Sequence, residues 1–419
     1  MSLDNFFNSS DLEFGLNYPI VRPTLNLNFT KLTKLSPIIN FTRNSQATYF
    51  DKNGILQTAG INQPVFEWDP VTKRCLGLRI WEGVTNSLVQ SQDFATTWTN
   101  SNLTVNTNTV TAPDGTLTAD TFGPVVGDGL TAARFLRQNP ALSTQGTYTL
   151  SVFVKIGTAN ANGIALYVSD QNGTNLFRAN YNLFSLTTSP GATTWATPTA
   201  YIIPCSNGWY RCVLTGVTST AHTSLRAIIY LNAFANTSDS YGTHHIWGAQ
   251  LNTGALAPYV PTTGLTASST ADVVSITGPA FAGIVNSSEG SAFINFSTAA
   301  TSANTPILSL YQASNSGGNR HSLRNGNVII TTNGVDVASF AQQVVSASAK
   351  AAYAYKANDY YYIVGSDGRS DTSGAVPVGI DSMNIGKVET SNIYLNGYIR
   401  QLRIYPVRLS NSQLKQLTS

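Results

Sequence analysis

The sequence predicts an all-β protein in which an extended N-terminal arm precedes two antiparallel β-sandwiches. Three observations predict this class. Apolar or alternating segments recur along the chain, each bounded by Gly, Asn, Asp or Pro, as strands between turns would be. The 33 Gly and 17 Pro, together with abundant Thr and aromatic residues, favour strands and turns over helices. The body of the chain has no long window with the periodicity of an amphipathic helix.

Charge is unusually scarce. Charged residues are 11% of the chain, whereas an ordinary globular protein has about 25%, so the surface must be polar through amide and hydroxyl groups. The 42% of hydrophobic residues is enough for buried cores and excludes a disordered polar tract. A net charge of +3 gives no electrostatic reason to bind nucleic acid or an anionic membrane. No apolar run approaches the roughly 20 residues that a membrane span requires.

Residues 1–84 are expected to form an attachment arm without a core of its own. The stretch LNLNFTKL alternates with period two from Leu25, as a half-buried strand would. Residues 49–58 are expected to form a hairpin, with Asn53 and Gly54 in a type I′ turn. The arm must bury its large rings against a neighbouring domain or another subunit, because exposed rings would form an aggregation-prone patch. These rings are Phe6, Phe7, Phe14, Phe29, Phe41, Phe50, Phe66, Trp68 and Trp81.

Residues 85–266 are expected to form the first sandwich. A turn is predicted at residues 112–116, where Pro fixes φ, Asp114 accepts local N–H groups and Gly takes positive φ. The predicted strands are residues 147–156, 163–170, 209–217, 225–234 and 244–251.

Residues 267–419 are expected to form the second sandwich. Residues 258–274 have the small, polar, Pro-containing composition of a linker. The chain is expected to end in a short helix, with Ser410 as its N-cap and Gln413 completing a capping box.

The three cysteines are Cys75, Cys205 and Cys212. Cys205 and Cys212 flank SNGWYR and could pair across a hairpin, but the odd count and the absence of a CxxC motif favour buried small hydrophobes. The first residues lack a basic region followed by an apolar core, so no secretory signal is expected. Synthesis in a cytoplasm is therefore expected.

Several collinear motifs carry a family resemblance. The middle region resembles the head-spike-fibre or tail-fibre modules of tailed-phage virions, through TNSLVQSQDFATTWTNSNLTV, TAPDGTLTADTF, YTLSVFVK, NGWYRC, HIWGAQL and YVPTTG. The arm resembles the segment that commonly precedes such a module, through INFTRNSQATYFDKNGILQTA and PVFEWDPVTKRCLGLRIWEGVTN. The C-terminal region resembles a laminin-G or concanavalin-like lectin domain, mostly through LNGYIRQLRIYPVRLSNSQLKQL.

The resemblance implies a jelly-roll sandwich like a carbohydrate-binding module, followed by a concanavalin or laminin-G-like sandwich. Members of the family serve as capsid-decorating fibres, tail fibres and adhesion proteins. Phage fibres and decoration proteins of this kind are usually threefold, so the resemblance also implies a homotrimer.

Acidic residues and histidines give no case for catalysis. Hydrolysis of a glycan needs two carboxylates that flank the bond. Here Asp114, Asp128, Asp170 and Asp367 stand at turns, where structural roles are expected. In the pair His244 and His245, alternation points one ring inward and the other outward, so a shared metal is not expected. His222 and His321 stand alone.

Aromatic residues are the candidates for glycan binding, because sugars stack their apolar faces on Trp and Tyr rings. Trp209 and Tyr210 are adjacent in a strand, so one is expected in the core and the other exposed, while Trp247 is expected in the core. A run of tyrosines in the second sandwich is expected to be part core and part surface, with Tyr361 on the face opposite its two neighbours. The run is Tyr353, Tyr355, Tyr360, Tyr361 and Tyr362.

One segment of the second sandwich offers oxygen ligands for calcium. Asp367 and Asp371 share the segment SDGRSD, and Ca²⁺ is bound by such oxygen ligands at the rim of some lectin-like sandwiches. The spacing is not that of an EF-hand, and a solvated loop without metal is the favoured interpretation.

Together these features predict a non-enzymatic structural protein of a phage virion, located on the head or tail. It is expected to contact other virion proteins through the arm and host-surface glycans through its sandwiches, without binding nucleic acid or inserting into membrane. A capsid-decorating or cementing role without a receptor is the alternative. A glycan-depolymerising tailspike is a third and less favoured reading.

Overall fold

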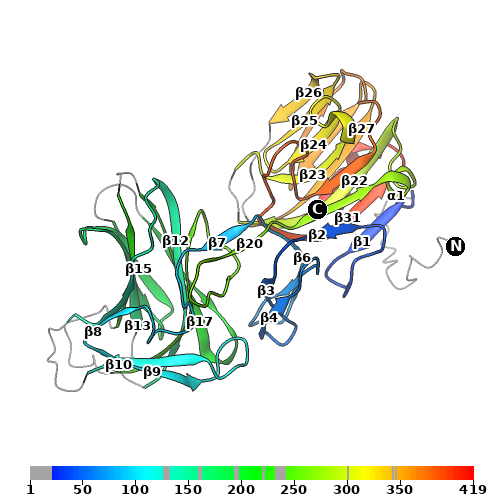
Figure 1. Cartoon of the computed structure of the whole chain (residues 1–419). Coiled ribbons are helices and arrows are strands. Elements are labelled where there is room, and N and C mark those ends of the chain that lie inside the picture. Colours follow the sequence, from blue (N-terminus) through cyan, green and yellow to red (C-terminus); the bar gives the residue numbers. More distant parts are fainter. Residues whose placement is uncertain are drawn as a thin grey trace. The chain divides into compact units, whose positions relative to one another are not determined.

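The computed structural model describes residues 21–125, 133–158, 163–192, 198–218, 222–231, 242–299, 302–341, 344 and 347–419 (Figure 1). In these residues antiparallel strands dominate, so the predicted all-β class is confirmed. The chain divides into two compact units. The central unit comprises Arg43–Cys75 and Gly83–Ala271, and the C-terminal unit comprises Met1–Thr42, Leu76–Glu82 and Asp272–Ser419.

The described part of the arm is therefore divided between the two units and is not a separate segment. In the C-terminal unit, β1 (Leu25–Asn28) pairs with one half of β31 (Gly397–Tyr405), and β2 (Asn40–Thr42) pairs with β21 (Val273–Thr277). These short strands cannot satisfy their own N–H and C=O groups, so they complete sheets that later residues build. The expected boundary at residue 84 is corrected accordingly.

Two six-stranded sheets form the central unit. The first, here the β12 sheet, has the order β16-β17-β12-β19-β10-β9, and the second, here the β13 sheet, has the order β15-β14-β13-β18-β11-β8. The strands of the β12 sheet are β16 (Thr199–Pro204), β17 (Trp209–Thr218), β12 (Gly146–Ile156), β19 (His244–Thr253), β10 (Ala119–Pro124) and β9 (Leu103–Val110). Those of the β13 sheet are β15 (Thr187–Ala192), β14 (Asn175–Asn182), β13 (Gly163–Asp170), β18 (Leu225–Leu231), β11 (Phe135–Gln138) and β8 (Thr99–Ser101).

The five strands predicted in this region are confirmed within a few residues as β12, β13, β17, β18 and β19. For β13 the prediction of residues 163–170 matches both ends. The last three residues of the segment 225–234 lie outside the described residues. Strand prediction succeeded here because each segment carries its own alternation and its own flanking turns.

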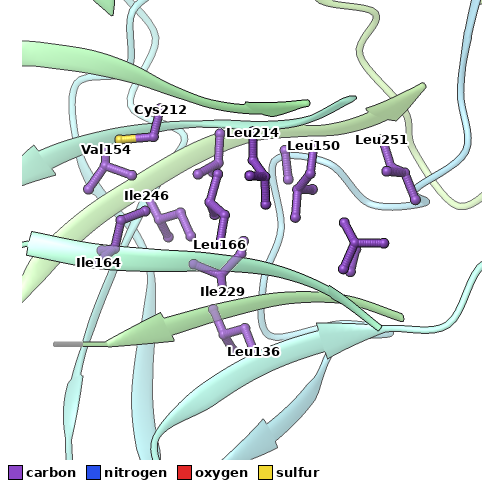
Figure 2. Close-up of a cluster of buried hydrophobic side chains, with 14 of the residues drawn as sticks. Leu136, Leu150, Val154, Ile164, Leu166, Cys212, Leu214, Ile229, Ile246 and Leu251 are labelled. Atoms are coloured by element: carbon purple, nitrogen blue, oxygen red, sulfur yellow. The ribbon is translucent and has the colours of Figure 1, made fainter. Parts of the chain in front are cut away.

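Apolar side chains from the two sheets meet in one core (Figure 2). The β12 sheet contributes Leu150, Val154 and Leu214, and the β13 sheet contributes Ile164 and Leu166. The hydroxyl of Tyr181 on β14 donates to the backbone carbonyl of Val213 on β17 at 2.6 Å. The two sheets therefore pack face to face, as the predicted sandwich requires.

A second cluster covers the other face of the β12 sheet. Trp209 and Trp247 pack there with Tyr259 and with Leu56 of the hairpin formed by β3 (Ala47–Phe50) and β4 (Leu56–Ala59). The hydroxyl of Thr48 donates to the carbonyl of Tyr259, which fixes the hairpin on this face. The arm thus packs on a neighbouring sandwich, one of the two expected outcomes.

The hairpin turn differs from the predicted type I′. A type I′ turn requires positive φ at both central residues, and of Asn53 and Gly54 only Gly54 has it, at 72°. The Asp51 carboxylate accepts the N–H groups of Asn53 at 2.8 Å and Ile55 at 3.0 Å, so a longer loop closes around this side chain. The hydrogen bonds of the aspartate that precedes the turn therefore stabilise a loop different from the predicted type I′ turn.

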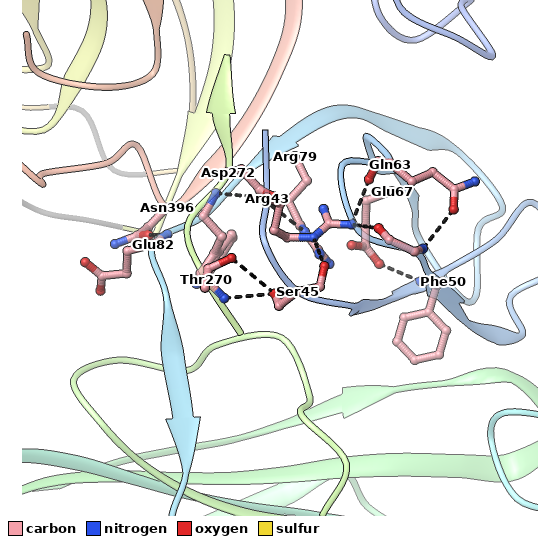
Figure 3. A network of polar contacts seen from close by, with 12 residues as sticks. Arg43, Ser45, Phe50, Gln63, Glu67, Arg79, Glu82, Thr270, Asp272 and Asn396 are labelled. Atoms are coloured by element: carbon pink, nitrogen blue, oxygen red, sulfur yellow. Dashed lines mark hydrogen bonds and ion pairs between the residues drawn. The ribbon is translucent and has the colours of Figure 1, made fainter. Parts of the chain in front are cut away.

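A buried arginine holds the rest of this segment together (Figure 3). The Arg43 side chain is 2% exposed and donates to the backbone carbonyls of Ser45 at 3.1 Å, Gly60 at 2.9 Å and Gln63 at 2.7 Å. The hydroxyl oxygen of Ser45 accepts the N–H of Thr270 at 2.9 Å. Carbonyl partners compensate the cost of removing the guanidinium from water.

The Asn and Thr-rich stretch at residues 99–110 forms the edge strands of both sheets. It supplies β8 to the β13 sheet and β9 to the β12 sheet, and only Asn102, with φ of 52°, separates the two strands. Four consecutive residues of β9 are exposed. Uncharged amide and hydroxyl groups therefore hydrate this edge in place of the Lys residues that often protect edge strands.

Two further sheets build the C-terminal unit. The β27 sheet has the order β29-β28-β27-β22-β31-β6, with β1 also on β31, and the β24 sheet has the order β2-β21-β30-β23-β24-β25-β26. Strands not yet given bounds are β29 (Asp367–Asp371), β28 (Tyr360–Val364), β27 (Ala347–Lys356), β22 (Glu289–Thr298), β6 (Cys75–Ile80), β30 (Ser382–Ile385), β23 (Pro306–Tyr311), β24 (Arg320–Arg324), β25 (Asn327–Thr332) and β26 (Val335–Ala341).

The C-terminal helix α2 (Asn411–Thr418) has the predicted cap. The Ser410 hydroxyl oxygen accepts the N–H of Gln413, and the Gln413 side chain accepts the N–H of Ser410, which is a capping box. Leu414 and Leu417 of α2 pack on the β27 sheet. Among the described residues no helix is long and apolar enough to cross a membrane.

Two buried histidines predict acid sensitivity. Burial, with a smaller contribution from the charge of His245, lowers the pKa of His244 to about 3, and burial alone lowers the pKa of His321 to about 3. In the unfolded chain both titrate near their ordinary value of about 6.5. A folded pKa below the unfolded pKa means that stability is complete above about pH 6.5 and is lost as the pH falls toward 3.

We expect the free energy of unfolding to fall by about 2 to 3 kcal/mol per histidine between pH 7 and pH 4.5. The His244→Phe variant should lose this dependence in the central unit, because neither ring nitrogen of His244 has a hydrogen-bond partner among the described residues. Urea unfolding followed by tryptophan fluorescence, to which the buried Trp209 and Trp247 of the central unit contribute, measures it. Parallel pH profiles for the variant and the wild type would contradict the assignment.

Candidate functional site

The five tyrosines expected to include a sugar-stacking surface are all buried, each at most 5% exposed. The hydroxyl of Tyr353 hydrogen-bonds Nδ1 of His321 at 2.7 Å, and that of Tyr362 donates to the carbonyl of Arg324 at 2.9 Å. Tyr360 donates to the carbonyl of Ala375 at 2.7 Å. These rings hold the two sheets of the C-terminal unit together, so the expected exposed tyrosine surface is corrected.

Both faces of the β27 sheet are covered, which explains the burial. Tyr353, Tyr355 and Tyr362 face the β24 sheet, and Tyr355 stacks on Tyr353 with centroids 5.8 Å apart. Tyr361 points the opposite way and packs with Leu414 of helix α2. The predicted alternation is thus confirmed, but α2 closes the face that alternation alone would leave exposed.

Trp209 and Tyr210 do not offer a free ring either. Trp209 is 1% exposed, and its indole N–H donates to the carbonyl of Thr111 at 3.1 Å. Tyr210 is half-buried and packs against the core between the sheets. Of the two rings, Trp209 is therefore the one in the core, as one of them was expected to be. Tyr210 faces the other way, but it is not exposed as predicted. Trp247 is in the core, as predicted.

Asp367 and Asp371 lie at the two ends of strand β29 and not in one loop. The four residue steps from Asp367 to Asp371 span about 13 Å, which is too far for both to bind one ion. Asp367 pairs with Arg369, and the Asp371 carboxylate accepts the N–H of Ser373 at 2.9 Å and its hydroxyl at 2.7 Å. The part of the chain that the structure describes has no group of three His, Cys, Asp or Glu residues able to hold a metal.

Two of the aspartates that we expected in turns occupy turns. Asp114 accepts the N–H of Thr116 at 2.9 Å. Asp170 accepts the N–H groups of Asn172 at 2.9 Å and Thr174 at 2.8 Å. Asp128 lies outside the described residues.

Three aromatic rings gather on the outward face of the β13 sheet. Phe135 on β11, Tyr230 on β18 and Tyr167 on β13 are all half-buried and point away from the core that their strand neighbours fill. The ring centroids of Phe135 and Tyr230 are 5.4 Å apart, and those of Tyr230 and Tyr167 are 4.7 Å apart. We call these three residues the aromatic row.

Strand register brings the row together. Phe135 lies opposite Tyr230, and Tyr230 lies opposite Ala165 on the next strand. Because Ala165 is small, the rings of Tyr230 and Tyr167 can meet across the strand pair. Burial, followed by the nearby Tyr167, raises the pKa of Tyr230 and keeps its hydroxyl protonated.

Arginines flank the aromatic row. The guanidinium carbon of Arg178 lies 5.4 Å from the ring centroid of Tyr167, and its Nη1 donates to the Tyr167 hydroxyl at 3.1 Å. The guanidinium carbon of Arg137 lies 5.8 Å from the Phe135 centroid. Arg178 is exposed and Arg137 is half-buried. These cation–π contacts orient each guanidinium beside a ring.

Arg320 of the β24 sheet, in contrast, pairs with a carboxylate. Nη1 of Arg320 lies 3.0 Å from Oε1 of Glu389, whose side chain is completely buried. The hydroxyl of Ser322 donates to the other carboxylate oxygen of Glu389 at 3.2 Å. Arg320, Ser322 and Glu389 contact one another, so they offer a ligand less than the outward face of the β13 sheet does.

The sequence predicted two strands of this site but not the site. Tyr167 and Tyr230 each occur once within predicted strands, inside apolar runs, and β11 was not predicted. The pairing of Phe135 with Tyr230 joins residues far apart in the chain. The signal that could have indicated the site is the alternation of side chains, since both tyrosines occupy outward positions of their strands.

Comparisons give no family assignment. No protein-family model and no curated protein matches the chain. Solved structures with partial similarity include the CBM40 of the Ruminococcus gnavus IT-sialidase bound to α2,3-sialyllactose, with 15% identity, 34% of this chain and 88% of that chain covered, and a TM-score of 0.28. At such a score the likeness adds nothing to the assignment of a site.

Two others are similar to the same limited degree. Domain 4 of AbnA, a GH43 extracellular arabinanase from Geobacillus stearothermophilus, in complex with arabinotriose, has 17% identity, coverage of 40% and 84%, and a TM-score of 0.29. The enzymatically active domain of bacteriophage CBA120 tailspike protein 4 has 15% identity, coverage of 40% of this chain and 21% of that chain, and a TM-score of 0.25.

The structural role of the tyrosine run is testable. We expect Tyr362→Ala to lower the free energy of unfolding by about 3 to 5 kcal/mol, because it leaves a cavity between the sheets. Val335→Ala, at a position that is 64% exposed in the same unit, should change it by less than about 0.5 kcal/mol. Equal stability of the two variants in urea unfolding would show that Tyr362 is not a core residue.

Proposed function

We propose that this is a non-enzymatic glycan-binding protein and that the aromatic row is its binding surface. The observation that carries the proposal is the outward-facing cluster of Phe135, Tyr167 and Tyr230. Its rings lie within 5.4 Å of their neighbours and are only half-buried. A sugar has apolar faces that stack on such rings, while Tyr hydroxyls hydrogen-bond its polar edge.

Polar groups next to the row suit a sugar ligand. Asn180 on β14 lies on the same outward face, is half-buried and is opposite Ala165 in the sheet. An amide offers both donors and acceptors, which matches the hydroxyl groups of a sugar. The low charge of the chain, 11%, leaves such amides and hydroxyls as the main polar groups of its surface.

We further propose that the protein works on the exterior of a phage particle, as a head or tail fibre. The support is the collinear sequence resemblance through the motifs of the arm and the central unit. Assembly as a homotrimer stays a prediction from that resemblance. Its physical argument is weaker, since Phe29 is buried and the other described arm rings, Phe41, Phe50, Phe66, Trp68 and Trp81, are half-buried within one chain.

The rival readings differ in what they require. A capsid-decorating or cementing protein needs contacts to a shell protein and no ligand on the β13 sheet. A depolymerising tailspike needs paired carboxylates around a bond, whereas Asp114 and Asp170 are engaged in turns. A glycan-array signal that depends on the aromatic row distinguishes adhesion from cementing.

We expect Tyr230→Ala to weaken glycan binding about tenfold, or about 1.4 kcal/mol, because it removes the central ring of the row. Tyr201→Ala is the matched control, since Tyr201 is 41% exposed on the other sheet of the same unit. Array signals and binding isotherms of the full-length variants measure the effect. If Tyr230→Ala binds every wild-type ligand unchanged, the row is not the binding surface.

A further inference from the structure

We propose that the ligand of the aromatic row is an acidic glycan, in which carboxylate or sulfate groups pair with Arg137 and Arg178. This inference rests on the proposed function and specifies its ligand class. It is carried by the distribution of charge on the outward face of the β13 sheet, by the contacts of these arginines, and by their positions relative to the rings.

The charge on this sheet is one-sided. The six strands of the β13 sheet contain three arginines, no lysine and a single carboxylate, Asp170. That carboxylate is the last residue of β13 and accepts two backbone N–H groups of the following turn. In a chain whose net charge is only +3, this concentration of arginine on one face produces a local positive potential.

None of the three arginines has a carboxylate partner among the described residues. Arg178 contacts the ring and hydroxyl of Tyr167, and Arg137 lies against Phe135. Arg226 donates from Nη2 to the carbonyl of Gln171. A guanidinium has five N–H donors, so donors remain for a ligand. Nε of Arg137 is buried and has no hydrogen-bond partner in the described structure.

The positions of two of the arginines fit a ligand that crosses the strands. The register places Arg137 opposite Ile228, Ile228 opposite Tyr167 and Tyr167 opposite Arg178. Three strand spacings therefore separate the backbones of Arg137 and Arg178, about 14 Å. An oligosaccharide lying across the row can contact both guanidinium groups, each of which matches a carboxylate or sulfate in a bidentate geometry.

A single-stranded nucleic acid also combines negative charge with groups that stack. The row favours a glycan over it, because its rings are tilted by 58° and 53° to one another and touch. Successive bases need separate ring faces, whereas contiguous tilted rings present one uneven surface to a non-planar sugar. Nucleic acid is accordingly one outcome of the test.

The test uses the full-length protein and two pairs of probes, each pair sharing a sugar backbone and consisting of a charged and an uncharged member. Oligogalacturonate is compared with its methyl ester, and dextran sulfate with dextran, by titration calorimetry at two salt concentrations. We expect the charged member of at least one pair to bind at least about tenfold more tightly, with affinity that falls as salt rises. No preference for the charged member in either pair, including no binding at all, overturns the inference.

Variants assign the effect to the arginines. The double variant Arg137→Gln, Arg178→Gln should lose about tenfold or more of its affinity for the acidic probe and keep the thermal unfolding midpoint of the wild type. Arg369→Gln is the control, since Arg369 is exposed in the C-terminal unit, where it pairs with Asp367. Equal losses in the double variant and the control, or no loss in the double variant, contradict the inference.

The two proposals fail in different ways. If Tyr230→Ala weakens binding but neither charge on the probe nor the arginine variants matter, glycan binding stands and the acidic ligand falls. If Tyr230→Ala leaves glycan binding unchanged, the proposed function itself falls. Tighter binding of a single-stranded DNA of equal charge than of either acidic glycan overturns the acidic-glycan inference and assigns the surface to nucleic acid.

Discussion

The alternation of side chains along a β-strand is the constraint on which the rest of this structure depends. Each strand sends successive residues to opposite faces, so every sheet has a second face that must be covered or left to solvent. On β13, Ile164 and Leu166 point into the core of the central unit. Ala165 and Tyr167, which alternate with them along the strand, face outward. What covers each second face decides where a ligand can bind.

Three of the four large sheets have a second face that is covered by other parts of the chain. The β3–β4 hairpin covers the cluster of Trp209 and Trp247 on the β12 sheet, and helix α2 covers Tyr361 on the β27 sheet. On the β24 sheet, the arginine Arg320 is paired with the buried Glu389. The outward face of the β13 sheet differs, because its rings are half-buried and its arginines lack acidic partners among the described residues.

Features set by neighbouring residues were predictable from the sequence. The bounds of β13, the capping box at Ser410 and the opposite orientation of His244 and His245 all follow from local patterns and are confirmed. Features set by distant residues were not. Nothing near Leu25 indicates that its strand pairs with β31 almost four hundred residues later, since β partners are chosen by the whole fold.

The candidate site also depends on distant residues more than on local patterns. Consecutive Tyr360, Tyr361 and Tyr362 occupy both faces of one strand, so their burial requires cover on both sides. A dense run of rings therefore indicates core more than surface. The aromatic row carries one ring per strand, at outward positions, and its two outer rings contact Arg137 of β11 and Arg178 of the adjacent strand β14. This weaker signal becomes visible only when the pairing of the strands is known.

If a glycan covers the outward face of the β13 sheet, hydroxyl-radical footprinting of the full-length protein detects it. The method reports the solvent accessibility of individual side chains. With saturating glycan, we expect oxidation of Phe135, Tyr167 and Tyr230 to decrease several-fold, while that of Tyr201, exposed on the β12 sheet, stays constant. Unchanged oxidation of the row, with protection appearing elsewhere on the molecule, would contradict it.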